Sequence, residues 1–343
     1  MPAAEPTTVG RPLGRSGILV GPVGLGCVTF GREIDEEASR RILDAAVERG
    51  MSLLDTAEAY GGGNARLYRR EHYRQDDARE VGGEMHSSEK ILGRWLRDRG
   101  SRKDVVLCTK VSSGNAPENV RLRLGQSLER LKADFVDIYM LHKPDPQVPI
   151  TETLAALNEE ASAGRVRTLG CSNFSAAQLR EALSVSEAKG WRRFEVVEPP
   201  YSLVAREAEP ELFPLCREAQ IGVAAYSPLA AGFLSGKYTP DRTRIPAGSR
   251  FDVAPGHADL YFQEDNFQLV GRLRQKAESL GMPMVRLAVW WAMMHPDVTT
   301  VLVGARSVDH LDSALSAASL PADARLRDEL SGLIPLSSAG GVS

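Results

Sequence analysis

The sequence has few cysteines and no long apolar run, and each shortage excludes a class of protein. Only four of its 343 residues are cysteine, and no two of them form a Cys-x-x-Cys pair. This pattern favours small buried thiols in a reducing compartment over a disulfide framework or a zinc site, and we predict no metal. No run of about 18 apolar residues occurs, and the N-terminal residues lack the apolar core of a signal peptide. We therefore expect a cytoplasmic protein with no membrane partner.

The sequence also lacks an excess of charge of either sign. Its formal net charge is −3 and its pI is about 6.1, with 25% charged and 43% hydrophobic residues. Without a broad basic surface, we expect no nucleic-acid partner. A small anionic ligand stays open, because a few local arginine and lysine side chains can bind one.

What the chain does contain is a regular alternation of strand-like apolar runs and helix-like segments. A predicted hairpin at 12–20 turns between Gly14 and Gly17. Strands are then expected at 23–27, 52–55, 105–110, 136–142, 166–172, 194–198, 222–226 and 298–304. Segments with apolar residues at helical spacing separate them. This pattern predicts an α/β fold, a (β/α)8 TIM barrel with an N-terminal β-hairpin and long βα loops, as a single domain over residues 1–343.

A doubly wound open sheet is the alternative architecture. Its sequence sign would be Gly-x-Gly-x-x-Gly between the first strand and the first helix. The glycines in this region stand at positions 21, 24 and 26, in the wrong order for that motif. The sequence therefore favours the barrel.

Polar residues stand at or just beyond the ends of most expected strands. They are Asp55, Tyr60, Lys110, His142, Ser172, Asn173, Glu198, Tyr226, Ser227 and Arg306, and Gly304 ends the last strand. A lone Asp, Lys or His at the end of an apolar strand is costly unless it meets a partner or a ligand. Because the βα loops of a barrel share one face, we expect these side chains to meet there. We interpret the other histidines, His72, His86, His257 and His295, as surface or loop residues.

The first four residue types predict proton transfer to an oxygen atom. An ammonium group near a tyrosine lowers the pKa of its hydroxyl, so Lys110 would make Tyr60 a better proton donor. Asp55 would keep a buried Lys110 protonated. His142 would donate a hydrogen bond to a substrate oxygen or relay a proton. Hydride addition to a carbonyl needs such a site.

Six segments resemble the aldo-keto reductase family, in the same order along the chain. They are DTAEAYG (55–61), LCTK (107–110), LHKPD (141–145), GCSNF (170–174), AYSPLAAGFLSGKY (225–238) and VLVGAR (301–306). The resemblance is to the branch that includes bacterial oxidoreductases and potassium-channel β subunits. It implies the barrel and a nicotinamide cofactor, with NADP favoured over NAD. It also implies Tyr60 as general acid/base, Lys110 and Asp55 as the pair that tunes its pKa, and His142 as the orienting donor.

The same resemblance implies a set of cofactor contacts. Ser172 and Asn173 would hold the carboxamide, and Tyr226 would stack on the nicotinamide ring. Ser227 and Leu229 would meet the pyrophosphate. The remaining expected contacts are Asp55, Glu198, Gly304 and His310, together with the phosphate-site cations Lys237, Arg250 and Arg306. The expected substrate is a small carbonyl or alcohol compound.

Three positions depart from the family pattern. Glu198 and His310 each replace a usual Gln, and Ala314 replaces an Asn expected near the adenine. A carboxylate at 198 would lie near the nicotinamide, which is cationic only when oxidised. Two unit charges about 6 Å apart at an effective dielectric near 20 interact by about 3 kcal/mol. We hypothesise that Glu198 favours either alcohol oxidation or tight retention of the oxidised cofactor.

An insertion of roughly 25 residues, 61–86, follows Tyr60 and is predicted as a loop. It carries five arginines: Arg66, Arg69, Arg70, Arg74 and Arg79. Long loops in compact domains are usually functional or disordered. Two interpretations stay open: a lid or wall that favours a polar or anionic substrate, or a solvated or subunit-contacting loop.

Two other function classes are weighed against the oxidoreductase. One is a cofactor-binding regulatory subunit with little turnover, which the channel-subunit resemblance allows. The other is an aldolase that forms a Schiff base on Lys110. The identity of the substrate does not follow from the sequence, because substrate loops vary independently of the barrel.

Overall fold

A computed structural model describes residues 10–100 and 102–333, and within them eight parallel strands close into a barrel. The barrel order is β10-β3-β4-β5-β6-β7-β8-β9. The strands are β3 (Val23–Gly26), β4 (Leu53–Asp55), β5 (Val106–Val111), β6 (Val136–Leu141), β7 (Val166–Ser172), β8 (Phe194–Glu198), β9 (Gly222–Tyr226) and β10 (Thr300–Gly304). Each boundary lies within two residues of the expected range, and the predicted (β/α)8 barrel is confirmed.

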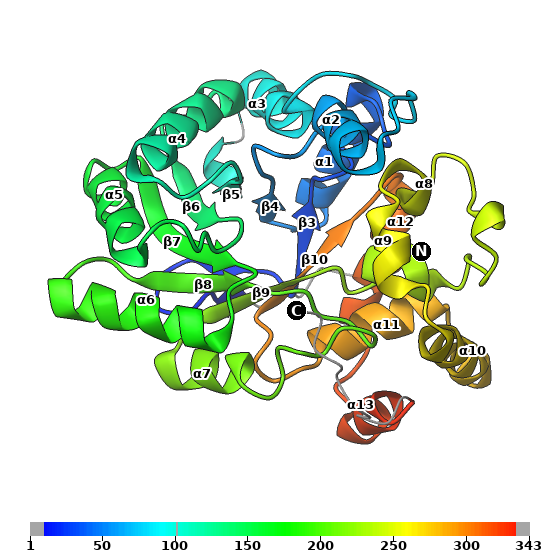
Figure 1. The fold of residues 1–343 in the computed structure, drawn as a ribbon. Helices are drawn as coiled ribbons and strands as arrows, with labels where there is room; N and C mark the ends of the chain where they lie inside the picture. Colours follow the sequence, from blue (N-terminus) through cyan, green and yellow to red (C-terminus); the bar gives the residue numbers. More distant parts are fainter. Residues whose placement is uncertain (1–9, 101, 334–343) are drawn as a thin grey trace.

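Helices surround the ring of strands, as Figure 1 shows. Those that follow the strands are α1 (Glu36–Glu48), α3 (Ser87–Arg99), α4 (Pro117–Leu131), α5 (Ile150–Ser162), α6 (Ala176–Lys189), α7 (Leu212–Ala219), α11 (Met284–Met293) and α12 (Val308–Leu315). Side-chain caps start several of them. Asp35 accepts from the backbone of Ala38 at the start of α1, and Ser175 and Gln178 form a reciprocal capping box at the start of α6.

Five further helices lie in the insertion, in the long segment after β9, and near the C-terminus. They are α2 (Gly62–Tyr73), α8 (Arg250–Val253), α9 (Gly256–Tyr261), α10 (Glu264–Ser279) and α13 (Ala324–Ser331). Short 3-10 turns are η1 (Arg102–Asp104), η2 (Ala230–Ser235), η3 (Arg242–Arg244) and η4 (Ser316–Ser319). The insertion expected to be a loop therefore begins with a helix of three turns. No helix of the described residues is long and apolar enough to cross a membrane.

The N-terminal hairpin closes one end of the barrel. Its strands, β1 (Arg11–Pro12) and β2 (Leu19–Val20), pair antiparallel, as predicted. Leu13 and Val20 are buried in one cluster with residues that point into the barrel. Gly14 has a positive φ, and a Cβ there would lie 2.5 Å from the backbone oxygen of Glu195, at the start of β8. The hairpin thus covers the N-terminal ends of the strands and leaves the C-terminal ends free.

All four cysteines are buried thiols, as the composition suggested. The expectation of one domain over residues 1–343 stays a prediction, since both ends of the chain fall outside the described residues.

Candidate active site

The polar residues at the strand ends form the next layer above the apolar interior of the barrel. The interior cluster includes Leu53, Cys108, Met140, Val196, Ala224 and Leu302, one from each of six strands. Two residues further along each chain segment stand Asp55, Lys110, His142, Glu198, Tyr226 and Gly304. Because side chains on a strand alternate between faces, residues two apart point the same way. The sequence order alone therefore directs this second set inward, at the C-terminal face.

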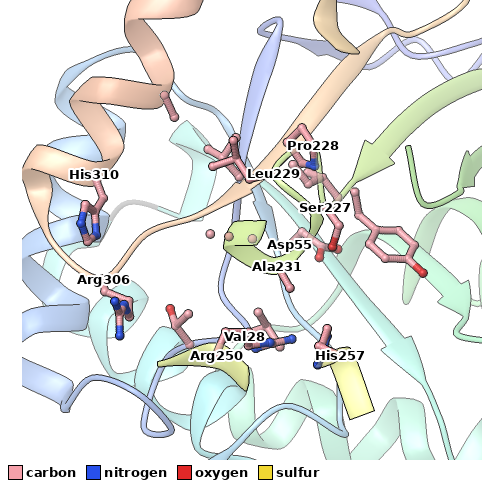
Figure 2. A pocket seen from close by; sticks show the side chains of 18 of the residues that line it. Val28, Asp55, Ser227, Pro228, Leu229, Ala231, Arg250, His257, Arg306 and His310 are labelled. Atoms are coloured by element: carbon pink, nitrogen blue, oxygen red, sulfur yellow. The ribbon is translucent and has the colours of Figure 1, made fainter. Parts of the chain in front are cut away.

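These residues line one cavity of about 490 Å³, a size typical of small-molecule and cofactor sites. Every residue expected to contact the cofactor lines it, and so do Asp55, Tyr60 and His142 of the expected catalytic set. Lys110 is fully buried and does not line it. In Figure 2, Arg306 and His310 lie toward one end of the cavity, and Asp55 and Ser227 lie away from them. The structure thus brings the predicted site residues together, while their roles stay predictions.

Lys110, on β5, forms ion pairs with side chains of two other strands, Asp55 on β4 and Glu198 on β8. Its Nζ forms an ion pair with Asp55 and donates to the backbone oxygen of Thr56 at 3.1 Å. Lys110 is 0% exposed and Asp55 is 3% exposed. Burial alone lowers the pKa of Lys110, but the carboxylates of Asp55 and then Glu198 outweigh it and raise that pKa well above its usual value. Lys110 is therefore an ammonium group.

Tyr60 lies between this ammonium group and His142. The Nζ of Lys110 is 5.3 Å from the centroid of the Tyr60 ring, and the Tyr60 and His142 rings meet edge to face at 5.6 Å. Lys110 lowers the pKa of Tyr60, as expected, but it does not decide the net direction of the shift. Burial raises that pKa more than Lys110 lowers it, and the carboxylates of Asp55 and Glu198 raise it further. Tyr60 is thus a protonated phenol at neutral pH.

His142 is a neutral imidazole. Burial lowers its pKa to about 3, and the charges of Lys110 and Lys143 act in the same direction. Its Nδ1 lies 2.6 Å from the hydroxyl oxygen of Ser112. When that hydroxyl donates, Nε2 carries the hydrogen and can donate to a ligand. Ser112 went unnoticed in the sequence, although it stands one residue beyond the end of β5.

Glu198 faces the same ammonium group from the other side of the barrel. It is 3% exposed, and its Oε2 lies 3.3 Å from the Nζ of Lys110. That oxygen has no hydrogen-bond partner among the described residues. Burial, then the charge of Asp55, raises the pKa of Glu198 to about 8. One oxygen each of Asp55 and Glu198, with the thiol of Cys108, lie within 4.8 Å of one another. The cationic group that pairs with both carboxylates is the ammonium group of Lys110. The expected lack of a metal stays a prediction.

At the end of β7, Asn173 already holds several partners. Its amide nitrogen donates to the backbone oxygen of His142 at 2.9 Å and to the hydroxyl of Ser172 at 3.1 Å. Its amide oxygen accepts from the hydroxyl of Tyr226 at 2.8 Å. This last bond fixes the ring of Tyr226 beside the cavity. One acceptor position on the Asn173 oxygen stays available for a ligand N–H.

The segment after β9 has an unusual backbone where it borders the cavity. Ser227, Ala230 and Ala231 have φ values of 56°, 49° and 55°, in the left-handed region that non-glycine residues rarely adopt. Such conformations cost about 1–3 kcal/mol each and concentrate at ligand sites. Figure 2 shows Ser227, Pro228, Leu229 and Ala231 beside the cavity. The geometry supports the expected role of this segment in holding a ligand.

Cationic side chains gather toward the end of the cavity marked by Arg306. Burial and then the charge of Arg306 lower the pKa of Lys237, and burial followed by Arg306 and Lys237 lowers that of His310. Arg250 is already paired, because its Nη1 lies 3.3 Å from Glu33, whose side chain is 1% exposed. Glu33 also lines the cavity, although no sequence pattern predicted it. An anion here would share Arg250 with Glu33.

The interpretation of His257 as a surface or loop residue is wrong. It lies on α9 and lines the cavity, and burial lowers its pKa to about 4. Its position reflects the packing of the α8–α9 segment over the barrel, which no local pattern in the sequence signals.

The insertion 61–86 supports this covering segment instead of lining the cavity. None of its residues, all of which are described, is among those that line it. Arg69 is 0% exposed, forms an ion pair with Glu80, and donates to the backbone oxygen of Val253 at 2.9 Å. Arg79 donates to the backbone oxygen of Asp252 at 2.9 Å. These bonds join the insertion to α8, the helix that begins at Arg250. The insertion therefore does not line this cavity, and its role as a lid or wall of a substrate pocket stays a prediction.

Comparisons with known proteins agree with the fold. The family model described as "Aldo/keto reductase family" matches residues 22–332. The chain is 32% identical to "Probable voltage-gated potassium channel subunit beta" of Oryza sativa subsp. japonica over 320 residues, which is 90% of each chain. It is 30% identical to "Uncharacterized oxidoreductase YrpG" of Bacillus subtilis over 94% of this chain and 95% of the relative. It is also 30% identical to "Aldo-keto reductase YhdN" of the same bacterium, over 87% and 85%. The chain belongs to the aldo/keto reductase family.

Proposed function

We propose that this protein is an NADP-dependent oxidoreductase that interconverts a small carbonyl compound and its alcohol, with Tyr60 as general acid/base. Membership of the family supports an oxidoreductase. The single observation that carries the finer proposal is the cavity, which joins Tyr60 and His142 to a cationic end at Lys237 and Arg306. The expected cytoplasmic location and the expected lack of nucleic-acid or membrane partners stay predictions.

The residues of the cavity fit a nicotinamide dinucleotide. The unpartnered oxygen of Glu198 and the remaining acceptor position of Asn173 suit an amide N–H group. The ring of Tyr226 offers a flat surface beside them. Lys237, Arg250 and Arg306 suit phosphate oxygens, and this cluster favours the extra phosphate of NADP over NAD. When bound, the cofactor supplies or accepts the hydride.

The protein residues supply the proton and the orientation. In the direction of reduction, Tyr60 gives its hydroxyl proton to the oxygen on which negative charge develops. Lys110, held protonated by its carboxylates, stabilises the phenolate that remains. His142, neutral at pH 7, donates one hydrogen bond to the same oxygen and fixes its position. In the direction of oxidation the phenolate takes the proton back.

The test is a screen of carbonyl and alcohol compounds with NADP and NAD, following the near-ultraviolet absorbance of reduced nicotinamide. We expect turnover with NADP, and a fall of about 10²–10⁴-fold in the Tyr60→Phe variant, because general acid/base catalysis contributes that much. Cofactor affinity should change little. Full activity in the Tyr60→Phe variant would remove Tyr60 from the chemistry.

A second function is favoured by the likeness to a protein named as a potassium-channel subunit. It is a cofactor-binding regulatory subunit with little turnover. Negligible turnover across the whole screen, together with a stable complex with a partner, would support it. A Schiff-base aldolase is not favoured, because Lys110 is fully buried and its raised pKa leaves little free amine.

A further inference from the structure

Lys110 is next to two carboxyl groups, whose combined negative charge would exceed its single positive charge if both were ionised. Two carboxylates, Asp55 and Glu198, pair with its single ammonium group, and all three side chains are buried. Asp55 has the closer contact, and Glu198 lies at 3.3 Å. If both carboxyl groups were ionised, the buried cluster would hold a net charge of −1. Buried charges without a partner are costly, and two close carboxylates resist ionising together.

Within residues 10–100 and 102–333, few other groups act on Glu198, and none of these is cationic apart from Lys110. The charged and titratable side chains that act electrostatically on it from the surrounding elements are Asp55 on β4, Tyr60 after β4, Cys108 and Lys110 on β5, and Tyr226 on β9. The nearby His142 is neutral. The cluster therefore has no second cation to balance the second carboxylate.

We propose that Glu198 is the neutral member of this cluster in the active enzyme, a positioning residue that carries a proton and acts on Tyr60 through Lys110. The proton would lie on the carboxyl oxygen turned away from Lys110, because Oε2 faces the ammonium group at 3.3 Å. The raised pKa of Glu198 agrees with this assignment. The part of the proposal that concerns Tyr60 rests on the proposed function.

The consequence for Tyr60 follows from charge alone. With Glu198 neutral, the negative charge of Asp55 and the positive charge of Lys110 balance. The phenolate that forms when Tyr60 gives up its proton is then opposed by no excess charge. When Glu198 loses its proton, the cluster becomes negative and opposes the phenolate. Because Tyr60 itself keeps its proton far into the alkaline range, a loss of reductive rate above neutral pH would report Glu198.

The first experiment needs no turnover. Infrared spectra of the purified protein, alone and with uniformly ¹³C-labelled glutamate, are recorded between pH 6 and 10. We expect the carbonyl band of a protonated carboxylic acid at pH 7, shifted by the label, lost as pH rises, and absent in the Glu198→Gln variant. Glu195→Gln is the matched control, because Glu195 lies on the same strand but pairs with Arg193 outside the cavity. It should keep the band.

An absent band at neutral pH overturns the proposal, and so does a band that the label does not move, which would place the proton on Asp55. If Glu198→Gln does not fold, Glu198→Asp in the glutamate-labelled protein decides the assignment, because an aspartate there would keep an acid band that the label no longer shifts.

The second experiment is the pH profile of kcat/KM for reduction. We expect it to fall by up to tenfold per pH unit above the ionisation of Glu198 in the parent enzyme, and to stay flat over that range in Glu198→Gln. Equal profiles in the two enzymes would refute the link to Tyr60. A labelled acid band in a protein without turnover would sink the proposed function and leave the proton on Glu198. Turnover without the band would refute the proton on Glu198 and leave the proposed function standing.

Discussion

The Arg69→Met substitution tests whether the insertion holds the cover of the cavity in place. Arg69 is 0% exposed, and its partner Glu80 has a side chain that is 3% exposed. Removing one member of a buried ion pair leaves the other charge without a partner, at a cost of about 3–5 kcal/mol. The same change removes the donors to the backbone oxygens of Val253 and Asp77. Because these contacts lie outside the barrel, we expect the cost to appear as local opening of the insertion.

Arg66→Met is the matched control, one turn earlier on α2. Arg66 pairs with Asp76 at 2.9 Å, but the two side chains are 44% and 56% exposed. Exposed pairs contribute about 0–1 kcal/mol, so this variant should behave like the parent. Both substitutions remove a positive charge from α2, but only Arg69→Met breaks a buried pair and the bond to Val253 on α8.

The assay is hydrogen exchange measured by peptide. In Arg69→Met we expect exchange in 62–80 and in 250–261 to speed up by about 10²–10³-fold, with β5 and β6 unchanged. Adding Glu80→Gln should recover part of the protection, because it removes the unpaired charge. A weakened affinity for NADP should follow, since Arg250 and His257 lie on the loosened segment. Equal exchange in the Arg69 and Arg66 variants would refute the bracing role.

Three further predictions concern the cavity. Arg306→Ala should weaken NADP binding about 10–100-fold, because hydrogen bonds to charged groups contribute about 1.5–3 kcal/mol, and should leave NAD binding unchanged in a fluorescence titration; equal losses for both cofactors would contradict it. Because the pKa of His142 in the folded protein is about 3, its stabilising effect is present above the unfolded pKa near 6.5 and is lost as pH falls below it; His142→Asn should flatten that acid loss in urea unfolding. The contribution of Glu198 to the free energy of unfolding has the opposite pH dependence, since the folded-state pKa of Glu198 is raised to about 8. That contribution is lost as pH rises from about 4.5 to 8, so the stability of Glu198→Gln should gain a few kcal/mol over the parent between pH 5 and 9. A constant difference in stability between the two proteins would count against this prediction.

The barrel itself could be predicted from the sequence because its signals are local. Each strand is a short apolar run, each helix repeats its apolar residues at helical spacing, and the period of two along the strands directs the polar ends inward. Asp55, Lys110 and Glu198 could each be assigned to the site in this way. Their position at strand ends needed no knowledge of distant contacts.

The features of the site that could not be predicted from the sequence depend on contacts between segments that are distant along the chain. The bond from Arg69 to Val253 joins residues 184 positions apart, and that from Arg250 to Glu33 joins residues 217 apart. Neither segment has a periodic pattern that predicts its partner. The same holds for the pKa of Tyr60, since the sequence indicates a nearby lysine but not how completely the phenol is buried.

The pairing of Glu198 with Lys110 shows why the four expected catalytic residues do not by themselves determine the chemistry. β8 is three strands from β5 in the barrel order, so the two side chains meet only because inward residues of one layer share the narrow interior. A single residue on β8 can therefore change the net charge of the cluster around Lys110 while Asp55, Tyr60 and His142 keep their places. The expected preference for oxidised cofactor depends on the same proton. A neutral Glu198 has no charge to attract the oxidised ring, whereas an ionised one leaves the cluster at −1. The preferred direction of reaction should then shift towards alcohol oxidation as pH rises through the ionisation of Glu198. The affinity ratio for the two cofactor forms, measured on both sides of that pH in the parent and in Glu198→Gln, tests this, and a ratio that changes equally in both would refute it.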